Sequence, residues 1–245
     1  MVHALGSPSS PRVERKREAR RREIMAAALG LVESGGLDGL TVKLLADELD
    51  NAVGALYRYF PSKSALVGEL QRHVVGLLDE LHHDQREHWR RLAGRGAPPP
   101  PGSAPLVPFA ASAALYLHYA AASPGAFGLL ALSLANPRRL IEDERAEAVL
   151  DTAQPIFERL AGDFEAAADA GALQPGPALD RAIVLWASLH GGAQLHKLTG
   201  LRPDRIDAAR LTRGLLEAVL VGWGAVPERV HEAIDWVTHR DVTRV

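Results

Sequence analysis

The sequence contains no cysteine among its 245 residues, so disulfides, thiolate metal sites and cysteine nucleophiles are excluded. No uninterrupted apolar run reaches roughly 18 residues, the length of a membrane-spanning helix, and the Ser- and Pro-rich start lacks the apolar stretch of a signal peptide. Alternating β-branched residues, which would indicate a sheet, are also missing. We therefore expect a cytoplasmic, all-α protein that has no membrane partner and whose fold is held together by packing alone.

The net charge is only −2, so the distribution of charge along the chain is more informative than its sum. Between Arg12 and Arg22 the chain has seven basic residues and only two acidic ones. A local excess of positive charge of this kind attracts a phosphate backbone. A solvated, partly disordered arm without a partner is the alternative, because charge runs are often only tails.

Apolar residues recur at intervals of three and four, and proline and glycine interrupt this helical period at several places. Ser34, Gly35 and Gly36 are expected to end the first helix, because glycine tolerates the left-handed conformation of a C-terminal cap. The hydroxyls of Thr41 and Ser62 are expected to cap two later helices. The predicted helices cover residues 15–33, 41–49, 52–59, 62–81, 108–122, 125–134, 143–170, 179–198, 204–223 and 227–237.

Proline determines two further expectations. Residues 94–101 include four consecutive prolines and are predicted to form an exposed loop. Pro155 is predicted to kink the helix 143–170 or to mark its true start.

Two short helices, 41–49 and 52–59, are joined by the tight connection Leu49-Asp50-Asn51. A pair of this kind is the helix-turn-helix unit that a major groove about 12 Å wide admits. Spacing alone does not decide the matter, because any small helical bundle supplies two short helices.

The residues themselves are more specific. The run GLTVKLLADEL at 39–49, followed by GALYRYFPSKSAL at 54–66, resembles the signature of the TetR family of repressors. With residues 24–28 and 33–36 before it, the likeness covers about residues 20–70. It implies a disordered N-terminal arm at 1–14, a three-helix DNA-binding domain at 15–62, and a helical ligand-binding and dimerisation domain at 63–245.

The resemblance also implies which residues meet double-stranded DNA. Tyr57 and Lys63 are expected to reach phosphates, Lys63 from a helix start whose free N–H groups favour an anion. Arg58 is expected either to read a guanine edge or to meet only phosphate, and both interpretations stay open. The predicted DNA-contacting residues are Thr41, Lys43, Val53, Gly54, Ala55, Tyr57, Arg58, Tyr59 and Lys63.

The chain departs from the family pattern at Asp50, Asn51 and Ala52. We expect Asn51 or Asp50 to cap the recognition helix one residue early. Few hydrogen-bond donors follow at the leading edge of that helix. Base recognition is therefore expected to use apolar contacts with thymine methyls, close approach at Gly54, and DNA shape.

One helix-turn-helix makes too few contacts for tight binding, so a homodimer that reads two half-sites is expected. The predicted dimer surface is the helix pair 179–198 and 204–223. Small residues interleaved with leucine would allow close helix approach there, and an ordinary intramolecular core is the alternative. The two predicted stripes are Ala182, Leu185, Trp186, Leu189 and Ala193, and Leu211, Leu215, Ala218, Val219 and Gly222.

A pocket for a small-molecule effector is implied between the fourth helix and the middle helices, with no cofactor and no metal. Mostly apolar pockets with a few polar groups are typical of such sites, although aromatic residues at helical spacing are more often plain core. The predicted lining residues are Trp89, Phe109, Tyr116, Tyr119, Phe127, Phe157, Trp186 and His190.

We therefore expect a non-enzymatic repressor that a small molecule releases from a palindromic operator. In this hypothesis the ligand favours a conformation in which the fourth helix swings and the recognition helices no longer match successive grooves. An architectural, ligand-independent DNA binder is one alternative. A metal-dependent helical enzyme, using His82, His83 and His88 or else His190 and His196, is another, but neither set has the Cys or Glu spacing of a known site.

Overall fold

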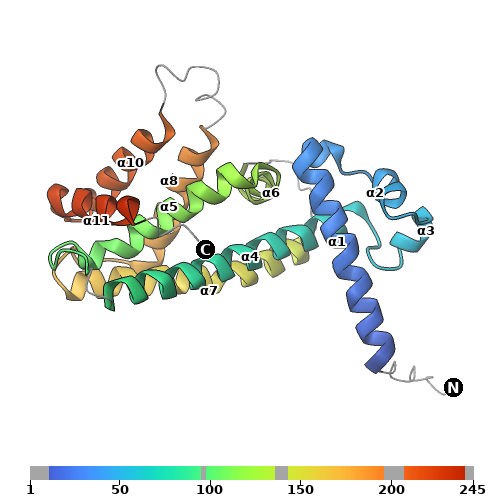
Figure 1. Ribbon diagram of the computed structural model, residues 1–245, viewed down its shortest axis with the longest axis horizontal. Coiled ribbons are helices and arrows are strands. Elements are labelled where there is room, and N and C mark those ends of the chain that lie inside the picture. The colour runs from blue at the N-terminus through green and yellow to red at the C-terminus, as the bar shows by residue number, and fades with distance from the viewer. Residues whose placement is uncertain (1–10, 95–97, 136–142, 196–206, 241–245) are drawn as a thin grey trace.

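A computed structural model describes residues 11–94, 98–135, 143–195 and 207–240, and these residues confirm the predicted all-α fold. Figure 1 shows a small helical group at one end of a long helix and a larger bundle around its other end. The elements are α1 (Pro11–Gly39), α2 (Val42–Glu48), α3 (Val53–Leu56), α4 (Lys63–Gly94), the 3-10 turn η1 (Ala104–Leu106), α5 (Val107–Ala122), α6 (Pro124–Ala135), α7 (Asp143–Asp169), α8 (Ala178–Gln194), α10 (Ala208–Gly222) and α11 (Pro227–His239).

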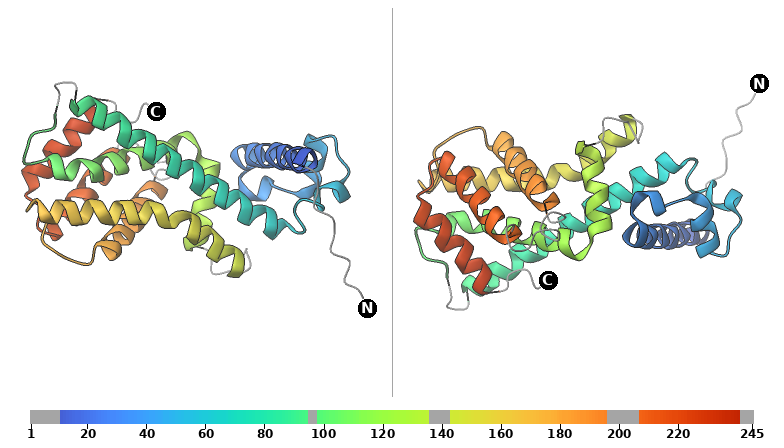
Figure 2. Two further views of the ribbon diagram at one scale, coloured as in Figure 1. Left: turned by 90° about the horizontal axis from the view of Figure 1, so that it is seen from below. Right: turned by 90° about the horizontal axis from the view of Figure 1, so that it is seen from above.

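The arrangement of the bundle follows from α4, which runs from the small N-terminal group into the larger group. Helix α7 lies along α4, and α5 and α8 pack against α7, as the views in Figures 1 and 2 agree. Helix α6 crosses between the bundle and α1. Within the described residues no single helix has the length and hydropathy of a membrane span. Only the region of α5 and α6, taken as a pair bent by 112°, reaches that composition.

Helix α1 begins earlier and ends later than its sequence predicts. Pro11 occupies the first helical turn, where its missing N–H costs nothing, so residues 11–14 of the predicted disordered arm are helical. Residues 1–10 of that arm lie outside the described residues. Gly36 interrupts the helix with φ 64°, which confirms the expected break, and a further short turn continues to Gly39.

The other helix ends agree closely with the prolines and glycines that predict them. Pro124 and Pro227 begin α6 and α11, and Gly171 with φ 69° follows the end of α7.

Two helices differ from the prediction. Helix α4 continues well beyond Leu81 to Gly94, and α7 runs through Pro155 without a new start. The predicted helix ends at 196–198 and 204–206 lie outside the described residues.

One continuous apolar core joins the two groups of helices. Ile24 and Ala28 of α1 are fully buried with Leu45 of α2 and Leu70 of α4. Further along, Phe109 of α5 packs on Phe164 of α7, with ring centroids 4.4 Å apart. The N-terminal group therefore rests on α4 and α6 and presents its remaining faces to solvent.

Candidate nucleic-acid interface and ligand pocket

The start of α2 is fixed by the side chain that the sequence predicts. The Thr41 hydroxyl accepts a hydrogen bond from the backbone N–H of Leu44, at 3.1 Å, which satisfies one donor of the first turn. Leu45 and Ala46 face the core, so Thr41 and Lys43 are left exposed.

The connection between α2 and α3 is closed by Asp50 and Asn51. Asp50 adopts the left-handed conformation, with φ 50°, and the Asn51 backbone N–H donates to the carbonyl of Ala46 at 2.9 Å. The Asn51 amide donates to the carbonyl of Leu49 instead of capping α3. The expected cap by Asn51 or Asp50 is therefore wrong: Ala52 is the N-cap and contributes no side-chain hydrogen bond.

Helix α3 is a single turn, shorter than the predicted 52–59, so Tyr57, Arg58 and Tyr59 follow its end. The Tyr59 backbone N–H donates to the carbonyl of Leu56 at 2.9 Å, which tightens the chain into a turn. Pro61 limits only how far a helix can continue, because the residue before it, Phe60, avoids the helical conformation and proline itself has no N–H.

Several residues of α3 and of the turn that follows it are exposed. Tyr57 is 46% exposed and Val53 is 39% exposed, and Gly54 and Arg58 are also exposed. Ala55 and Tyr59 are partly buried. The apolar contact of this segment with the core is made by Leu56 and Phe60.

Lys63, the first residue of α4, is exposed as well. The Ser62 hydroxyl accepts from the Ala65 N–H at 3.0 Å, which confirms the predicted cap and leaves the Lys63 ammonium exposed beside the helix start. Arg21 of α1 packs over the Phe60 ring, 5.0 Å from its centroid, and pairs with Glu69 of α4 at 3.1 Å. All nine predicted DNA-contacting residues are thus accessible at least in part, on elements that α1 and α4 hold in place.

The basic part of α1 is exposed as well. Residues 11–19 are exposed along their whole length, and Figure 1 shows this end of α1 projecting beyond the N-terminal group. Basic residues near a helix N-terminus are unfavourably placed relative to the helix dipole, and these exposed side chains do not pack in the core. Neither effect therefore explains why so many basic residues lie here. Their arrangement is compatible with a polyanion beside them.

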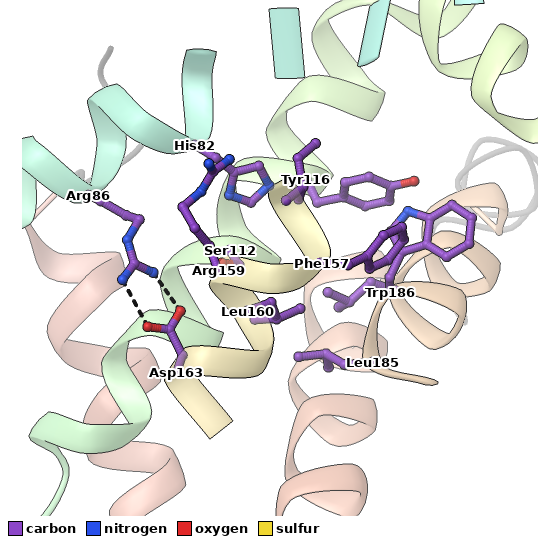
Figure 3. Close-up of a pocket in the computed structure, with 12 residues that line it drawn as sticks. His82, Arg86, Ser112, Tyr116, Phe157, Arg159, Leu160, Asp163, Leu185 and Trp186 are labelled. Carbon is purple, nitrogen blue, oxygen red and sulfur yellow. Dashed lines mark hydrogen bonds and ion pairs between the residues drawn. The ribbon is translucent and has the colours of Figure 1, made fainter. Parts of the chain in front are cut away.

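A cavity of about 40 Å³ lies between α4, α5, α7 and α8. Figure 3 shows charged side chains at one end of it and aromatic rings at the other. A space of this size holds a few water molecules, so a larger molecule requires the walls to move. The lining residues are His82, Arg86, Ser112, Tyr116, Ile156, Phe157, Arg159, Leu160, Asp163, Leu185, Trp186 and Leu189.

The charged end of the pocket is internally balanced. Arg86 of α4 binds the Asp163 carboxylate of α7 through both guanidinium nitrogens, at 2.5 and 2.8 Å, and Arg159 pairs with Asp79. Burial and the positive charge of Arg86 lower the pKa of His82 to about 4, so its imidazole is neutral. The pocket therefore has no unpaired charge for an ionic ligand.

The aromatic end is organised around Tyr116 and His190. The Tyr116 hydroxyl lies 2.6 Å from His190 Nδ1, and Phe127 of α6 stacks on the imidazole with centroids 4.8 Å apart. Phe157 and Trp186 meet edge to face at 5.4 Å. Burial raises the pKa of Tyr116 and lowers that of His190, so both groups are neutral.

The structure brings most, but not all, of the predicted pocket residues together. Tyr116, Phe157 and Trp186 line the cavity, and Phe127 and His190 lie directly behind Tyr116. The other three predicted residues do not line it: Phe109 packs on Phe164 in the core, and Trp89 and Tyr119 lie elsewhere on α4 and α5.

Sequence reasoning missed the charged lining residues. His82 and Arg86 on α4, and Arg159 and Asp163 on α7, are each four residues apart, the spacing that places two side chains on one helix face. Charged pairs at that spacing, on two helices expected to pack together, could have indicated these lining residues. Among the described residues no three His, Asp or Glu side chains lie close enough to hold a metal ion, and His196 is outside them.

The predicted dimer stripe on α8 is wrong. Its members Ala182, Leu185, Leu189 and Ala193 are buried within the single chain, and Trp186 is partly buried at the pocket. The exposed apolar side of α8 is the neighbouring one, where Ile183 is 43% and Val184 is 48% exposed. The exposed apolar and small residues are Leu179, Ile183, Val184, Ala187 and Gly191 of α8, Leu195 at its C-cap, and Ala209, Leu211, Gly214, Ala218 and Gly222 of α10.

A second, larger groove of about 420 Å³ lies between α5, α10 and α11. Its walls are mostly alanine and aliphatic side chains, with Arg210 and Arg213 among the few polar ones. None of its lining residues belongs to α4 or α6, which both pack against α1.

Two family models match the chain. One, described as "Bacterial regulatory proteins, tetR family", matches residues 24–70, and the other, "Tetracyclin repressor-like, C-terminal domain", matches residues 109–219. Together they cover both the helix-turn-helix and most of the helices that enclose the pocket.

Among curated proteins, the HTH-type transcriptional repressor KstR of Rhodococcus jostii is 45% identical over 58 residues, which are 22% of this chain and 27% of that protein. KstR of Mycolicibacterium smegmatis is 42% identical over 74 residues, 28% of this chain and 36% of that protein. The chain thus matches less than two thirds of the length of these relatives.

Solved structures share the fold across nearly the whole chain. A protein of unknown function from Rhodococcus sp. RHA1 has a TM-score of 0.62 at 21% identity, covering 91% of this chain and 99% of that one. RolR in complex with resorcinol has a TM-score of 0.60 at 16% identity, covering 90% and 95%.

Proposed function

The chain belongs to the TetR family, whose members are transcriptional regulators and not enzymes, and we propose that it is a repressor that a small molecule releases from its operator. The observation that carries this proposal is the exposed surface of Tyr57, Arg58 and Lys63 in a fold that also encloses a separate pocket. A DNA-binding surface and a pocket on one continuous core are what ligand-controlled DNA binding requires.

On DNA, the surface divides into positioning and reading groups. Lys63 and Tyr57 would hold phosphates, with Thr41 and Lys43 at the start of α2 beside them. Gly54 and the exposed side chain of Val53 allow close approach to base edges and thymine methyls. Arg58, just after α3, reads a guanine edge or meets phosphate, and base preference at one position distinguishes the two.

The basic end of α1 would add a sequence-independent contribution. Its exposed cations stand beyond the helix-turn-helix and would lie against the backbone of flanking DNA. Such contacts raise affinity by counterion release and make it steeply dependent on salt.

Two copies of the chain would pair through the exposed apolar side of α8 and α10. Ile183, Val184 and Leu211 are large apolar side chains left in solvent, and Gly214, Ala218 and Gly222 let a second helix pair approach closely. Four helices from two chains would bury this surface and set the spacing of two recognition surfaces.

The effector would be an uncharged molecule with a ring. The arginines of the pocket are already paired, so an added charge would stay uncompensated there, whereas Phe157 and Trp186 offer aromatic walls. The 40 Å³ pocket is preferred to the larger groove because it alone borders α4. Because it is small, occupation must move its walls, which is how binding could reach the DNA-binding group.

The test combines melting and footprinting with the full-length protein. Uncharged cyclic compounds and matched carboxylates are screened for a rise in melting temperature, since a ligand at about 100 times its Kd stabilises by about 2.7 kcal/mol. Compounds that stabilise are then added to footprints on the intergenic DNA beside the protein's own gene. Loss of the footprint supports the proposal. A footprint that no stabilising compound alters would leave a ligand-independent DNA binder.

A further inference from the structure

Glu33, in α1 of the DNA-binding group, holds the N-terminus of α6 in the bundle. Its two carboxylate oxygens accept hydrogen bonds from the backbone N–H groups of Gly125 and Ala126, each at 2.9 Å. These N–H groups lie in the first turn of α6, where they have no partner within the helix. One side chain of the DNA-binding group therefore caps a helix of the ligand-binding group.

The same contact brings two backbones together. A Cβ atom added at Gly125 would lie 2.6 Å from the Glu33 Cα and 2.6 Å from the Val32 carbonyl oxygen. Real Cβ atoms do not approach other atoms so closely, so any other residue at 125 would push α6 away from α1. Because the two backbones are closely packed, a shift of α6 must either move α1 with it or break both hydrogen bonds.

The following turn of α6 reaches the pocket wall. Phe127 stacks on His190, which is bound to Tyr116 of the lining. The buried Gln71 of α4 donates to the carbonyl of Leu129 at 2.9 Å. Within five residues, α6 is thus joined to the aromatic end of the pocket, to α4 and to α1.

We propose that Glu33 is the residue that couples the pocket to the DNA-binding surface, through the N-terminus of α6. This inference rests on the proposed ligand-controlled repression and adds a second route to the swing of α4 expected from the sequence. A molecule that enlarges the pocket displaces Tyr116 and His190 and, with them, Phe127. Helix α6 then shifts against α1, and the free energy of the Glu33 contact differs between the two states, as allosteric coupling requires.

A tethered side chain replaces the unidentified effector in the test. Ser112→Phe places a ring in a cavity of about 40 Å³ and forces the walls apart, with Ser112→Leu as a smaller wedge if the first variant does not fold. Glu33→Gln keeps the shape but offers one acceptor oxygen to two N–H groups. Glu23→Gln, a change of the same kind on an exposed residue of α1, is the matched control.

Operator affinity is measured by fluorescence anisotropy for the four combinations of Ser112→Phe and Glu33→Gln, on a duplex that the full-length protein selects from a random pool. The inference predicts that Ser112→Phe raises Kd at least fivefold in the parent and in the Glu23→Gln variant. In the Glu33→Gln variant, Ser112→Phe should raise Kd less than twofold. If Ser112→Phe raises Kd by the same factor with Glu33 as with Glu33→Gln, the role of Glu33 is overturned and ligand control stays intact. A wedge that changes Kd nowhere would contradict the proposed ligand control itself, and with it this inference.

A second pair of variants tests the contact between α6 and α1 without changing any residue of the pocket. Gly125→Ala inserts a methyl group against the α1 backbone and is expected to raise Kd at least fivefold with no wedge present. Gly128→Ala, on the same helix with no atom within 4 Å of the added methyl, is expected to change Kd less than twofold. If the two variants melt at the temperature of the parent and bind the operator with equal Kd, the inference is overturned.

Discussion

The Tyr116 hydroxyl lies 2.6 Å from Nδ1 of His190, and both side chains are almost completely buried. A neutral imidazole carries one proton, so this bond joins one donor and one acceptor for either tautomer of His190. The other ring nitrogen, Nε2, has no hydrogen-bond partner among the described residues.

Tyr116→Phe removes this link without changing the shape of the wall. A buried nitrogen of His190 then loses its partner, so we expect the free energy of unfolding to fall by about 1–3 kcal/mol. Urea denaturation of both proteins measures it. Tyr57→Phe, at an exposed site, serves as the control and should unfold like the parent. Equal stability of all three proteins would show that the hydrogen bond contributes nothing.

Acid should destabilise the folded protein through His82. Its pKa is lowered to about 4 from 6.5, so between these values the unfolded chain binds a proton that the folded protein does not. The free energy of unfolding therefore decreases as the pH falls from 6.5 towards 4, by at most about 2 kcal/mol at pH 5. Burial lowers the pKa of His190 too, which acts in the same direction.

Thermal melting from pH 7 to pH 5 measures this dependence. His82→Gln should flatten it, whereas His118→Gln, at an exposed position of α5, should leave it as in the parent. Identical pH profiles for the parent and His82→Gln would contradict the assignment of the lowered pKa to this residue.

Lys63→Ala should weaken binding to every duplex by a similar factor. Loss of one phosphate contact per protomer reduces the slope of log K against log salt by about one per protomer. Anisotropy titrations at several salt concentrations measure it, with Arg229→Ala on the distant α11 as the control. An unchanged slope would remove Lys63 from the phosphate contacts.

Ile183→Asp should prevent the proposed pairing of two chains. The substitution leaves one chain's core untouched, because Ile183 is 43% exposed, but a dimer would bury two unpaired carboxylates. We expect the dimer Kd to rise at least about a hundredfold, a loss within the 2–5 kcal/mol that such changes cost. Sedimentation velocity measures it. Leu150→Asp, at a 65% exposed leucine of α7, should stay dimeric, and equal behaviour of the two variants would place the interface elsewhere.

Most helix boundaries could be predicted because they depend on local chemistry. Pro124 and Pro227 begin helices, Gly36 interrupts one, and the Thr41 hydroxyl caps another, all within a few residues of the chain. The end of α3 was harder to predict. Pro61 bars a helix only from about Phe60 onwards, so no local signal of this kind marks an end at Leu56.

The dimer stripe could not be predicted because α8 is apolar on two adjacent sides. Leu185 and Leu189 satisfy the helical period as well as Ile183 and Val184 do, and only packing against α7 and α10 decides which pair is buried. The contact of Glu33 with α6 is equally inaccessible to sequence reasoning, because it joins residues more than 90 positions apart.

Selection of duplexes from a random pool by the full-length protein, sequenced after each round, tests the central claim most directly. We predict enrichment of an inverted repeat with its half-sites about one or two helical turns apart, bound by a dimer and lost when Lys63 and Tyr57 are both replaced by alanine. Sequences without two-fold symmetry, no enrichment, or equal retention by that double variant would contradict the account.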